Sequence, residues 1–507
     1  MKTLITTLLL VISTSLFSQS IEWETNLGGS NNDATSSIQQ TTDGGYIVAG
    51  YSYSPDGDVG GNNGVGDFWI VKLDSTGSLV WETNLGGSNS DVAFSVQQTT
   101  DDGYIVAGRS ASIDGDVGGN NGDNDYWIVK LDSTGSLLWE TNLGGSGNDT
   151  AYSIQQTIDG GYIVAGLSFS TDGDVGGNNG IFDSWIVKLN STGSLVWETN
   201  LGGSSSDNAF SIKQTTDDGF IVAGGSNSAD GDVGGNNGGY DYWIVKLDST
   251  GNLIWETNLG GSNEDVAFSI EQTTDDGYIV AGHSFSTDGD VGGNNGDSDY
   301  WIVKLDSTGN LIWETNLGGS NWDIAYSIKQ TTDGGYIIAG YSESTNGDVG
   351  GNNGNFDSWI VKIDSTGNLV WETNFGGSNG DYAESIEQTT DGGYIVAGYS
   401  FSTDGDVGGN NGGFDYWIVK LDGTLGIEDN TASKISLSPN PTANTITIAN
   451  LSEEITKIEV LDMQGRLMLS QNNIINNTIS LSNLQSATYL VKIYVGRTIF
   501  YKKVIKK

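Results

Sequence analysis

The chain of 507 residues contains no cysteine and three prolines, and its 64 acidic and 20 basic residues give a formal net charge of −44. Without cysteine, neither a disulfide framework nor a thiolate metal site can form, so stability must come from packing and from any cations bound by oxygen ligands. Nucleic acids and anionic lipids need a positive protein surface, so this acidity excludes both classes of partner.

The first 20 residues, MKTLITTLLLVISTSLFSQS, contain a lysine, then a short apolar stretch, then small residues. This pattern is typical of a secretory signal peptide that is removed before Ile21. No later segment approaches 18 consecutive apolar residues, so the mature chain is predicted to contain no transmembrane segment.

Two series of tryptophans repeat every 58 residues, from Trp23 to Trp371 and from Trp69 to Trp417. Each unit has four short apolar runs, which read AFSVQQT, GYIVAG, YWIVKLD and SLVWETNL in the second unit. These runs are rich in Val, Ile and aromatic residues and are separated by tight turns, so we expect four antiparallel strands per unit. Seven units predict an all-β fold, a seven-bladed β-propeller over residues 21–422, with the tryptophans between the blades.

The two ends of the repeat array are complementary. The mature chain opens with the fourth run of a unit, Ile21–Leu27, and the array stops at a third run, Tyr416–Asp422. We expect these two runs to pair and to close the ring, because an open array would expose unpaired strand edges.

The segment LDSTGSLVWETNLGG resembles the hairpin between the third and fourth strands of pyrroloquinoline-quinone-type propeller repeats. The runs DGGYIVAG and FWIVKLD are similar to those of secreted bacterial propeller repeats. This resemblance implies the architecture of the blades and does not imply quinone binding.

The order of strands places the loops NLGGSNSD and DGDVGGNNG on one face of the ring, the upper face, where the acidic residues gather. In DGDVGGNNGVGD, Asp56, Asp58 and Asp67 take the first, third and twelfth positions around a glycine, which overlaps the calcium-loop pattern. The fifth position is Gly60 and no helices flank the loop, so capping of backbone amides in an exposed loop stays an alternative. Calcium is the one candidate cofactor, and its candidate ligands are Asp56, Asp58, Asp67, Asp114, Asp116, Asp125, Asp172, Asp174, Asp183, Asp230, Asp232, Asp241, Asp288, Asp290, Asp299, Asp348, Asp357, Asp404, Asp406 and Asp415.

Differences between units cluster just after the second strand and just after the GGS segment, and both places map to the upper face. A protruding, partly aromatic rim is typical of a surface that binds a glycan or a protein partner. Neutral drift in loops predicts the same clustering, so this alternative stays open. The candidate rim residues are Tyr51, Arg109, His283, Trp322, Tyr341 and Tyr399.

The ring has few groups that are suited to catalysis. His283 is its only histidine and Arg109 its only arginine, which excludes a Ser-His-Asp triad and an arginine triad. Each blade offers nearly the same carboxylates, whereas an active site needs asymmetry. The sequence therefore predicts that the protein is not an enzyme and that His283 is a solvated loop residue. A glycosidase is the alternative, and it would have a carboxylate pair in one blade without counterparts in the others.

The composition changes after the repeats. Residues 21–426 contain 58 acidic and 10 basic residues, whereas residues 430–507 contain 4 acidic and 9 basic residues. Residues 423–433 read as a polar linker. In residues 434–507 apolar and polar residues alternate, which predicts a small β-sandwich.

This C-terminal segment resembles the type A C-terminal sorting domain of the bacterial type IX secretion system. The motifs are PNP, LDMQGR, LSNLQSATYLVKI and a basic end, although SATY lacks the usual glycine before tyrosine. The residues that carry the resemblance are Pro439, Asn440, Pro441, Gly465, Tyr489, Lys502, Lys503, Lys506 and Lys507.

The resemblance implies a Gram-negative bacterium, the type IX secretion machinery as a partner, and a ring that is secreted or held at the outer cell surface. The function expected from the sequence is a non-catalytic binding or adhesion propeller. An extracellular carbohydrate-active enzyme and a passive structural surface protein are the alternatives.

Overall fold

In a computed structural model, the chain divides into two compact units, Met1–Thr424 and Leu425–Lys507. The structure describes residues 19–423, 436–449, 455–462, 466–472, 474, 477–495 and 498–507. The expected signal peptide, apart from its last two residues, and the expected linker, apart from Gly423, lie outside these ranges. None of the described residues belongs to a helix of the length and apolarity needed to cross a membrane.

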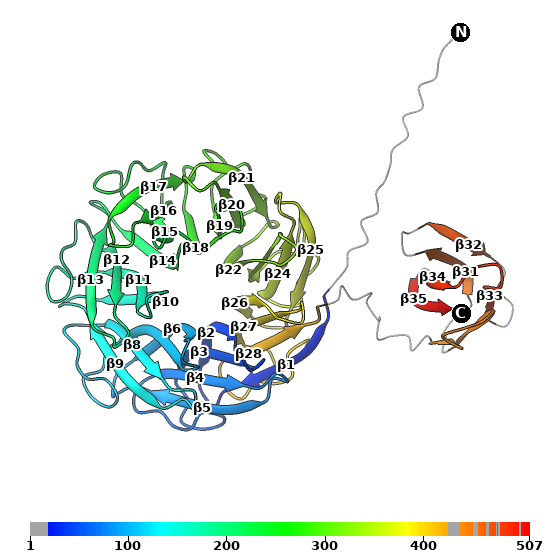
Figure 1. Cartoon of the computed structure of the whole chain (residues 1–507), viewed down its shortest axis with the longest axis horizontal. Helices are drawn as coiled ribbons and strands as arrows, with labels where there is room; N and C mark the ends of the chain where they lie inside the picture. The colour runs from blue at the N-terminus through cyan, green and yellow to red at the C-terminus, as the bar shows by residue number, and fades with distance from the viewer. Residues whose placement is uncertain are drawn as a thin grey trace, which may run out of the picture. The chain divides into compact units, whose positions relative to one another are not determined.

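The first unit confirms the predicted fold class, because seven four-stranded antiparallel sheets surround a channel (Figure 1). The innermost strands are β2 (Asp33–Gln40), β6 (Asp91–Gln98), β10 (Asp149–Gln156), β14 (Asp207–Gln214), β18 (Asp265–Gln272), β22 (Asp323–Gln330) and β26 (Asp381–Gln388). The second strands are β3 (Tyr46–Ser52), β7 (Tyr104–Ser110), β11 (Tyr162–Ser168), β15 (Phe220–Ser226), β19 (Tyr278–Ser284), β23 (Tyr336–Ser342) and β27 (Tyr394–Ser400).

The outer half of each blade is built from the last two strands of its repeat. The third strands are β4 (Asp67–Leu73), β8 (Asp125–Leu131), β12 (Asp183–Leu189), β16 (Asp241–Leu247), β20 (Asp299–Leu305), β24 (Asp357–Ile363) and β28 (Asp415–Leu421). The outermost strands are β5 (Leu79–Leu85), β9 (Leu137–Leu143), β13 (Leu195–Leu201), β17 (Leu253–Leu259), β21 (Leu311–Leu317), β25 (Leu369–Phe375) and β1 (Ile21–Leu27). We number the blades 1 to 7 from β2, so that β26, β27, β28 and β1 form blade 7.

The first strand of the chain completes the last blade. Strand β1 pairs antiparallel with β28, with Leu27 opposite Tyr416 and Trp23 opposite Lys420. This is the pairing expected from the order of runs at the two ends of the array. The ring therefore closes by hydrogen bonds between segments almost 400 residues apart in the sequence.

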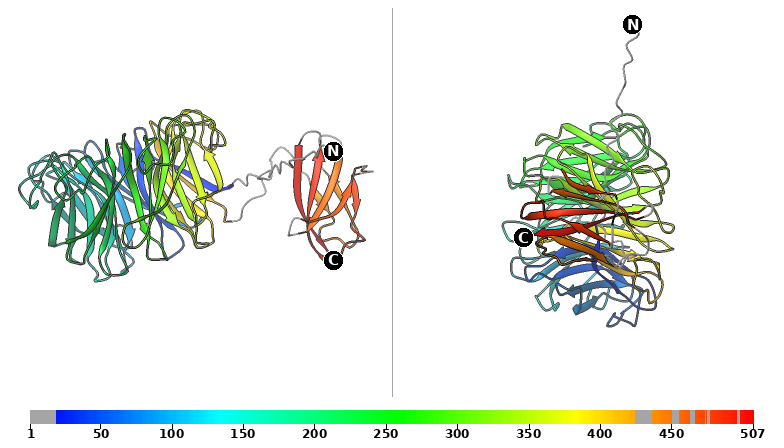
Figure 2. Two further views of the ribbon diagram at one scale, coloured as in Figure 1. Left: turned by 90° about the horizontal axis from the view of Figure 1, so that it is seen from above. Right: turned by 90° about the vertical axis from the view of Figure 1, so that its right-hand side faces the viewer.

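The core lies between neighbouring blades. The third strands are buried along their whole length, and their tryptophans are among the largest fully buried side chains. Between blades 1 and 2, the rings of Phe68 and Trp127 lie 4.5 Å apart, in a cluster with Ile70, Val106 and Val129. The tryptophans thus fill the space between blades, as predicted, and the strands run between the two faces of the ring (Figure 2).

The second unit contains a three-stranded sheet and a four-stranded sheet that share one apolar core, which confirms the small β domain. The three-stranded sheet contains β29 (Ser436–Ser438), β30 (Thr445–Ala449) and β33 (Thr478–Ser480). The four-stranded sheet contains β32 (Leu467–Gln471), β31 (Ile455–Asp462), β34 (Ala487–Val495) and β35 (Thr498–Lys506).

The motifs expected to carry sorting occupy different places in this unit. Asn440 of the PNP motif bonds β35, since its amide donates to the Lys503 carbonyl and accepts from the Ile505 amide. Tyr489 is buried and its hydroxyl donates to the Gln485 carbonyl. Along the basic end, Lys503 and Lys507 are exposed, Lys502 is half-buried and Lys506 is buried, because side chains alternate along the strand. Gly465 lies outside the described residues.

Candidate functional site

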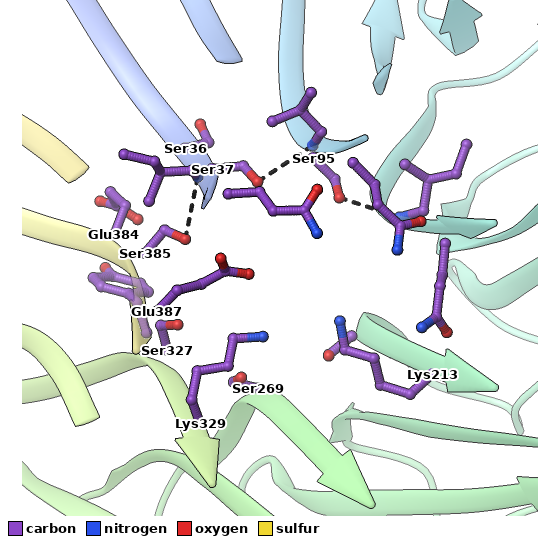
Figure 3. Close-up of a pocket in the computed structure, with 18 residues that line it drawn as sticks. Ser36, Ser37, Ser95, Lys213, Ser269, Ser327, Lys329, Glu384, Ser385 and Glu387 are labelled. Atoms are coloured by element: carbon purple, nitrogen blue, oxygen red, sulfur yellow. Dashed lines mark hydrogen bonds between the residues drawn. The ribbon is translucent and has the colours of Figure 1, made fainter. Parts of the chain in front are cut away.

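The innermost strands line the channel, and each contains a β-bulge. In every blade the register with the second strand shifts around the fourth residue, as between Thr35 and Ser37 in β2. A bulge leaves one residue unpaired and turns its side chain. Side chains from the fourth, fifth and seventh positions of these strands therefore line the cavity of about 160 Å³ in the channel (Figure 3).

The fifth position is serine in all seven blades and holds the ring together. The Ser37 hydroxyl accepts a hydrogen bond from the Val96 amide of the next blade at 3.2 Å, and Ser385 accepts from Ile38 at 3.3 Å across the closure. The same bond is present at all seven junctions. We define these residues as the serine ring: Ser37, Ser95, Ser153, Ser211, Ser269, Ser327 and Ser385. Its role is structural, although it faces the channel.

The seventh position also joins blades, but only at five of the seven junctions. Gln39, Gln97 and Gln155 each accept a bond of 2.6 Å from the eighth-residue amide of the next blade. Glu271 and Glu387 accept the corresponding bonds at 3.1 and 3.0 Å. Blades 4 and 6 have Lys213 and Lys329 at this position, and an ammonium group cannot accept a hydrogen bond. These two junctions therefore lack the bond.

The four charged residues at the seventh position, which we call the charged tier, are Lys213, Glu271, Lys329 and Glu387. Lys329 forms an ion pair with Glu271 at 2.8 Å. Although burial opposes its charge, Glu271 and Glu387 hold the pKa of Lys329 above its ordinary value. The Lys213 ammonium forms no hydrogen bond or ion pair with any described residue, and the charge of Lys329, followed by burial, lowers the pKa of Lys213 to about 8. Figure 3 shows Lys213 across the channel from Glu387.

The fourth position is aromatic in five consecutive blades. We call these residues the aromatic tier: Phe94, Tyr152, Phe210, Phe268 and Tyr326. Their ring centroids lie 5.0 to 5.1 Å from one neighbour to the next, which is the distance of favourable aromatic contacts. Blades 1 and 7 interrupt the tier with Ser36 and Glu384, and both side chains line the same cavity.

Three of the residues predicted to form a protruding rim pack on side chains of the innermost strands. Of the side chains placed on the second strands, Tyr341 is 8% exposed and packs on Tyr326, and Arg109 lies over the Phe94 ring. Tyr399 stacks on Tyr382 at 4.8 Å. The prediction of protrusion is wrong for Tyr341, which is buried, whereas Arg109 and Tyr399 are half-buried. All three lie near the end of a paired strand and pack on a residue of the innermost strand.

The other predicted rim residues behave differently from one another. His283 is 5% exposed and packs between Phe268 and Phe285, so its prediction as a solvated loop residue is wrong. Its Nε2 atom lies 3.7 Å from a Glu264 carboxylate oxygen. Tyr51 is half-buried against Tyr53, and Trp322 alone protrudes, with 42% of its surface exposed.

The predicted calcium ligands bind backbone amides in the structure. Asp56 accepts from the Ser30 amide at 2.8 Å, and Asp58 accepts from the Gly28 amide at 3.3 Å, so both hold the chain that crosses from the neighbouring blade. Asp67 begins a strand, is fully buried and accepts from the Asn63 amide at 2.6 Å. No three acidic or histidine side chains converge on a metal-sized position within the described residues. Calcium binding stays a prediction.

A buried pair of carboxylates lies at each junction between blades. A Cβ atom added at Gly86 would clash with Asp67 Oδ1 and would lie 2.6 Å from Asp91 Oδ2, so the two carboxylates flank this glycine. Burial, followed by the charges of Asp91 and Asp116, raises the pKa of Asp67 to about 6 against the hydrogen bond from Asn63. The same arrangement recurs around the ring.

The fold and the tail together define a β-propeller protein that carries a secretion sorting domain. Residues 436–507 match the family described as Secretion system C-terminal sorting domain, which confirms the resemblance to type IX sorting tails and indicates export from a Gram-negative cell. Residues 211–394 match the family described as Arylsulfotransferase (ASST).

More distant relatives cover only parts of the chain. Regulatory protein FlaEY from Caulobacter vibrioides is 27% identical over 227 residues, which is 42% of this chain and 23% of that protein. The WD repeat-containing protein L264 from Acanthamoeba polyphaga mimivirus is 21% identical over 409 residues, which is 61% of this chain and 29% of that protein. The chain therefore spans less than a third of the length of these relatives.

Among solved structures, BamB from Moraxella catarrhalis is 14% identical, with a TM-score of 0.38 over 79% of this chain and 100% of that chain. A puromycin hydrolase is 11% identical, with a TM-score of 0.46 over 92% of this chain and 59% of that chain.

The match to an arylsulfotransferase family overturns the prediction that the protein is not an enzyme. That prediction relied on missing triads and on carboxylates shared by every blade. The differences between blades lie at the channel positions, where Lys213, Lys329 and Glu384 have no counterparts in most blades. An alignment of the seven repeats shows these substitutions, but the strand bulge that turns the fourth residue into the channel is not visible in it.

Proposed function

We propose that the protein is an exported propeller that binds a small anionic ligand in its channel, between Lys213 and Lys329. The observation that carries this proposal is the loss of an acceptor at two of seven junctions. Each lysine removes an acceptor whose inter-blade hydrogen bond is worth about 0.5–1.5 kcal/mol to stability. Lys329 regains an inter-blade bond through Glu271, whereas Lys213 does not. A local loss of stability of this kind is typical of functional sites.

The chemistry of the charged tier favours an oxyanion. Lys213 has no partner among the described residues and lies close enough to Lys329 for the two charges to repel. A sulfate, phosphate or carboxylate group between them would relieve this repulsion and accept hydrogen bonds from both ammonium groups. The aromatic tier, three residues further up the same strands, offers ring faces to an aromatic part of such a ligand. Export by the sorting domain would place this site outside the cell.

Sulfuryl transfer from an aryl sulfate is the second candidate, and the match to an arylsulfotransferase family favours it. The matched residues 211–394 include the whole charged tier as well as Glu384. In this candidate, the two lysines would hold the sulfuryl oxygen atoms and stabilise the negative charge that develops during transfer. The aromatic tier would hold the aryl group of the donor.

Titration calorimetry of the purified ring with inorganic sulfate and with p-nitrophenyl sulfate tests the first candidate. The buffer should contain about 0.15 M NaCl, because the acidic surface repels anions at lower ionic strength. Binding of both probes, weaker in Lys213→Gln, supports the proposal, and absence of binding overturns it. Addition of phenol to the p-nitrophenyl sulfate mixture tests the second candidate. Formation of phenyl sulfate with release of p-nitrophenolate supports transfer, whereas binding without release leaves only the first candidate.

A further inference from the structure

Glu384 is the one carboxylate at the fourth position of the innermost strands, where five blades have an aromatic residue and blade 1 has Ser36. Its side chain lines the channel cavity. The carboxyl group forms no hydrogen bond or ion pair with any residue that the structure describes. Burial alone raises its pKa to about 7, so no neighbouring charge stabilises or opposes its ionised form.

Five tyrosines from blades 1, 6 and 7 lie within electrostatic range of this carboxyl group, and one of them, Tyr326, lines the same cavity. Burial raises the pKa of each of them, and the charge of Glu384 adds to the rise in every case. They are Tyr51, Tyr326, Tyr341, Tyr382 and Tyr399. We call them the tyrosine cluster.

Four rings of the tyrosine cluster are in contact with one another, whereas Tyr51 packs on Tyr53. Tyr326 and Tyr341 lie 5.9 Å apart, Tyr341 and Tyr382 lie 4.9 Å apart, and Tyr382 stacks on Tyr399 at 4.8 Å. These four rings thus form a continuous aromatic wall, and its first member, Tyr326, lines the same cavity as the unpaired carboxylate. Aromatic faces carry negative electrostatic potential, so the wall and Glu384 attract the same kind of ligand.

We propose that Glu384 and the tyrosine cluster bind an organic ammonium cation, such as a trimethylammonium group. A cation of this type pairs with the carboxylate through charge and packs its methyl groups on the ring faces. A calcium ion would need six to eight oxygen ligands, and one carboxylate cannot supply them. The proposal goes beyond the anion site, since the charged tier lies three residues further along the strands and carries its own lysines.

A neutral sugar fits the same wall less well. Sugar rings stack on aromatic faces, but they would leave the buried carboxylate without a counter-charge, which is costly. The loops of the upper face are also strongly acidic, since they carry Asp56, Asp58 and their equivalents. This field draws cations toward the mouth and repels anions. Both arguments favour a cationic ligand.

Choline and its neutral isostere 3,3-dimethyl-1-butanol distinguish charge recognition from apolar packing. Each probe is titrated into the full ring at fixed ionic strength and the heat is measured by calorimetry. A reference titration uses NaCl in place of choline chloride. Glu384→Gln keeps the shape and removes the charge. Asp123→Asn removes one charge from an exposed upper loop of blade 2 and serves as the matched control. Unchanged thermal midpoints of both variants show that folding is intact.

We expect choline to bind at least about ten-fold more tightly than the isostere, and Glu384→Gln to remove this preference. Tyr399→Leu should weaken choline binding by about five-fold, because it removes one aromatic face. Asp123→Asn should change the affinity by less than about two-fold. Equal binding of the two probes, equal loss in Asp123→Asn, or binding of glucose without choline would overturn the proposal. If Glu384→Gln fails to fold, Glu384→Ser, which reproduces the residue of blade 1, replaces it.

Discussion

Replacing Lys213 by glutamine is expected to strengthen the ring and weaken anion binding in a single change. Glutamine is the residue that blades 1, 2 and 3 have at this position, where its side-chain oxygen accepts a bond of 2.6 Å from the next blade. In Lys213→Gln the amide of Gln272 in blade 5 gains the same acceptor.

The restored hydrogen bond should contribute about 0.5–1.5 kcal/mol to the free energy of unfolding. Removal of the repulsion between Lys213 and Lys329, which helps to lower the pKa of Lys213 to about 8, adds to the gain. The opposite effect is expected on binding. A charge-assisted bond to an oxyanion is worth about 1.5–3 kcal/mol, so the affinity for sulfate should fall by about ten- to one-hundred-fold.

Urea denaturation followed by tryptophan fluorescence measures the first effect, and calorimetric titration with sulfate measures the second. The reciprocal variant Gln155→Lys is the control, because it removes a 2.6 Å bond and adds a lysine to the adjacent blade. It should lower the urea midpoint. The reasoning that the lysines bind a ligand at the expense of stability would be refuted if Lys213→Gln were less stable than the wild type. An unchanged affinity of Lys213→Gln for sulfate would refute it as well.

Three other predictions concern the ring. Deleting Ile21–Leu27 should broaden and lower the thermal transition, because β28 loses its outer partner, and an unchanged transition would rule out closure by this strand. Raising the pH from 5 to 8 should lower the stability. Seven buried aspartates bind protons more tightly in the folded state than in the unfolded chain, where the pKa of aspartate is near 3.8. Their contribution to the free energy of unfolding is therefore complete below pH 3.8 and is lost as the pH rises through 6 to 7. The groups are Asp67, Asp125, Asp183, Asp241, Asp357 and Asp415, with pKa values of about 6, and Asp299, with a pKa of about 7. A midpoint that rises with pH would contradict this. Chelation with EDTA should lower the thermal midpoint if the loops that contain Asp56 and Asp58 bind calcium, and an identical midpoint would leave only their bonds to backbone amides.

The fold could be predicted because its determinants are local and repeated. Each strand carries its own pattern of β-branched and aromatic residues, and the 58-residue period sets the number of blades. The array begins with a fourth run and ends with a third run. This order also predicts that Ile21–Leu27 pairs with the end of the array, because the last blade lacks only its fourth strand. The sorting tail is recognisable for the same reason, because its motifs lie in order within a short segment.

The sites depended on the tertiary structure. Lys213 and Lys329 lie 116 residues apart in the sequence, and most of the repeat array lies between Tyr51 and Glu384. No local sequence pattern therefore links the members of either site. Their proximity results from closure of the ring around a channel. The bulge at the fourth residue decides which side chains enter that channel, and inward packing of the second strands decides that His283 and Tyr341 are buried. A sequence records which residues differ between repeats, but only the packing of the blades determines which of these differences face one another.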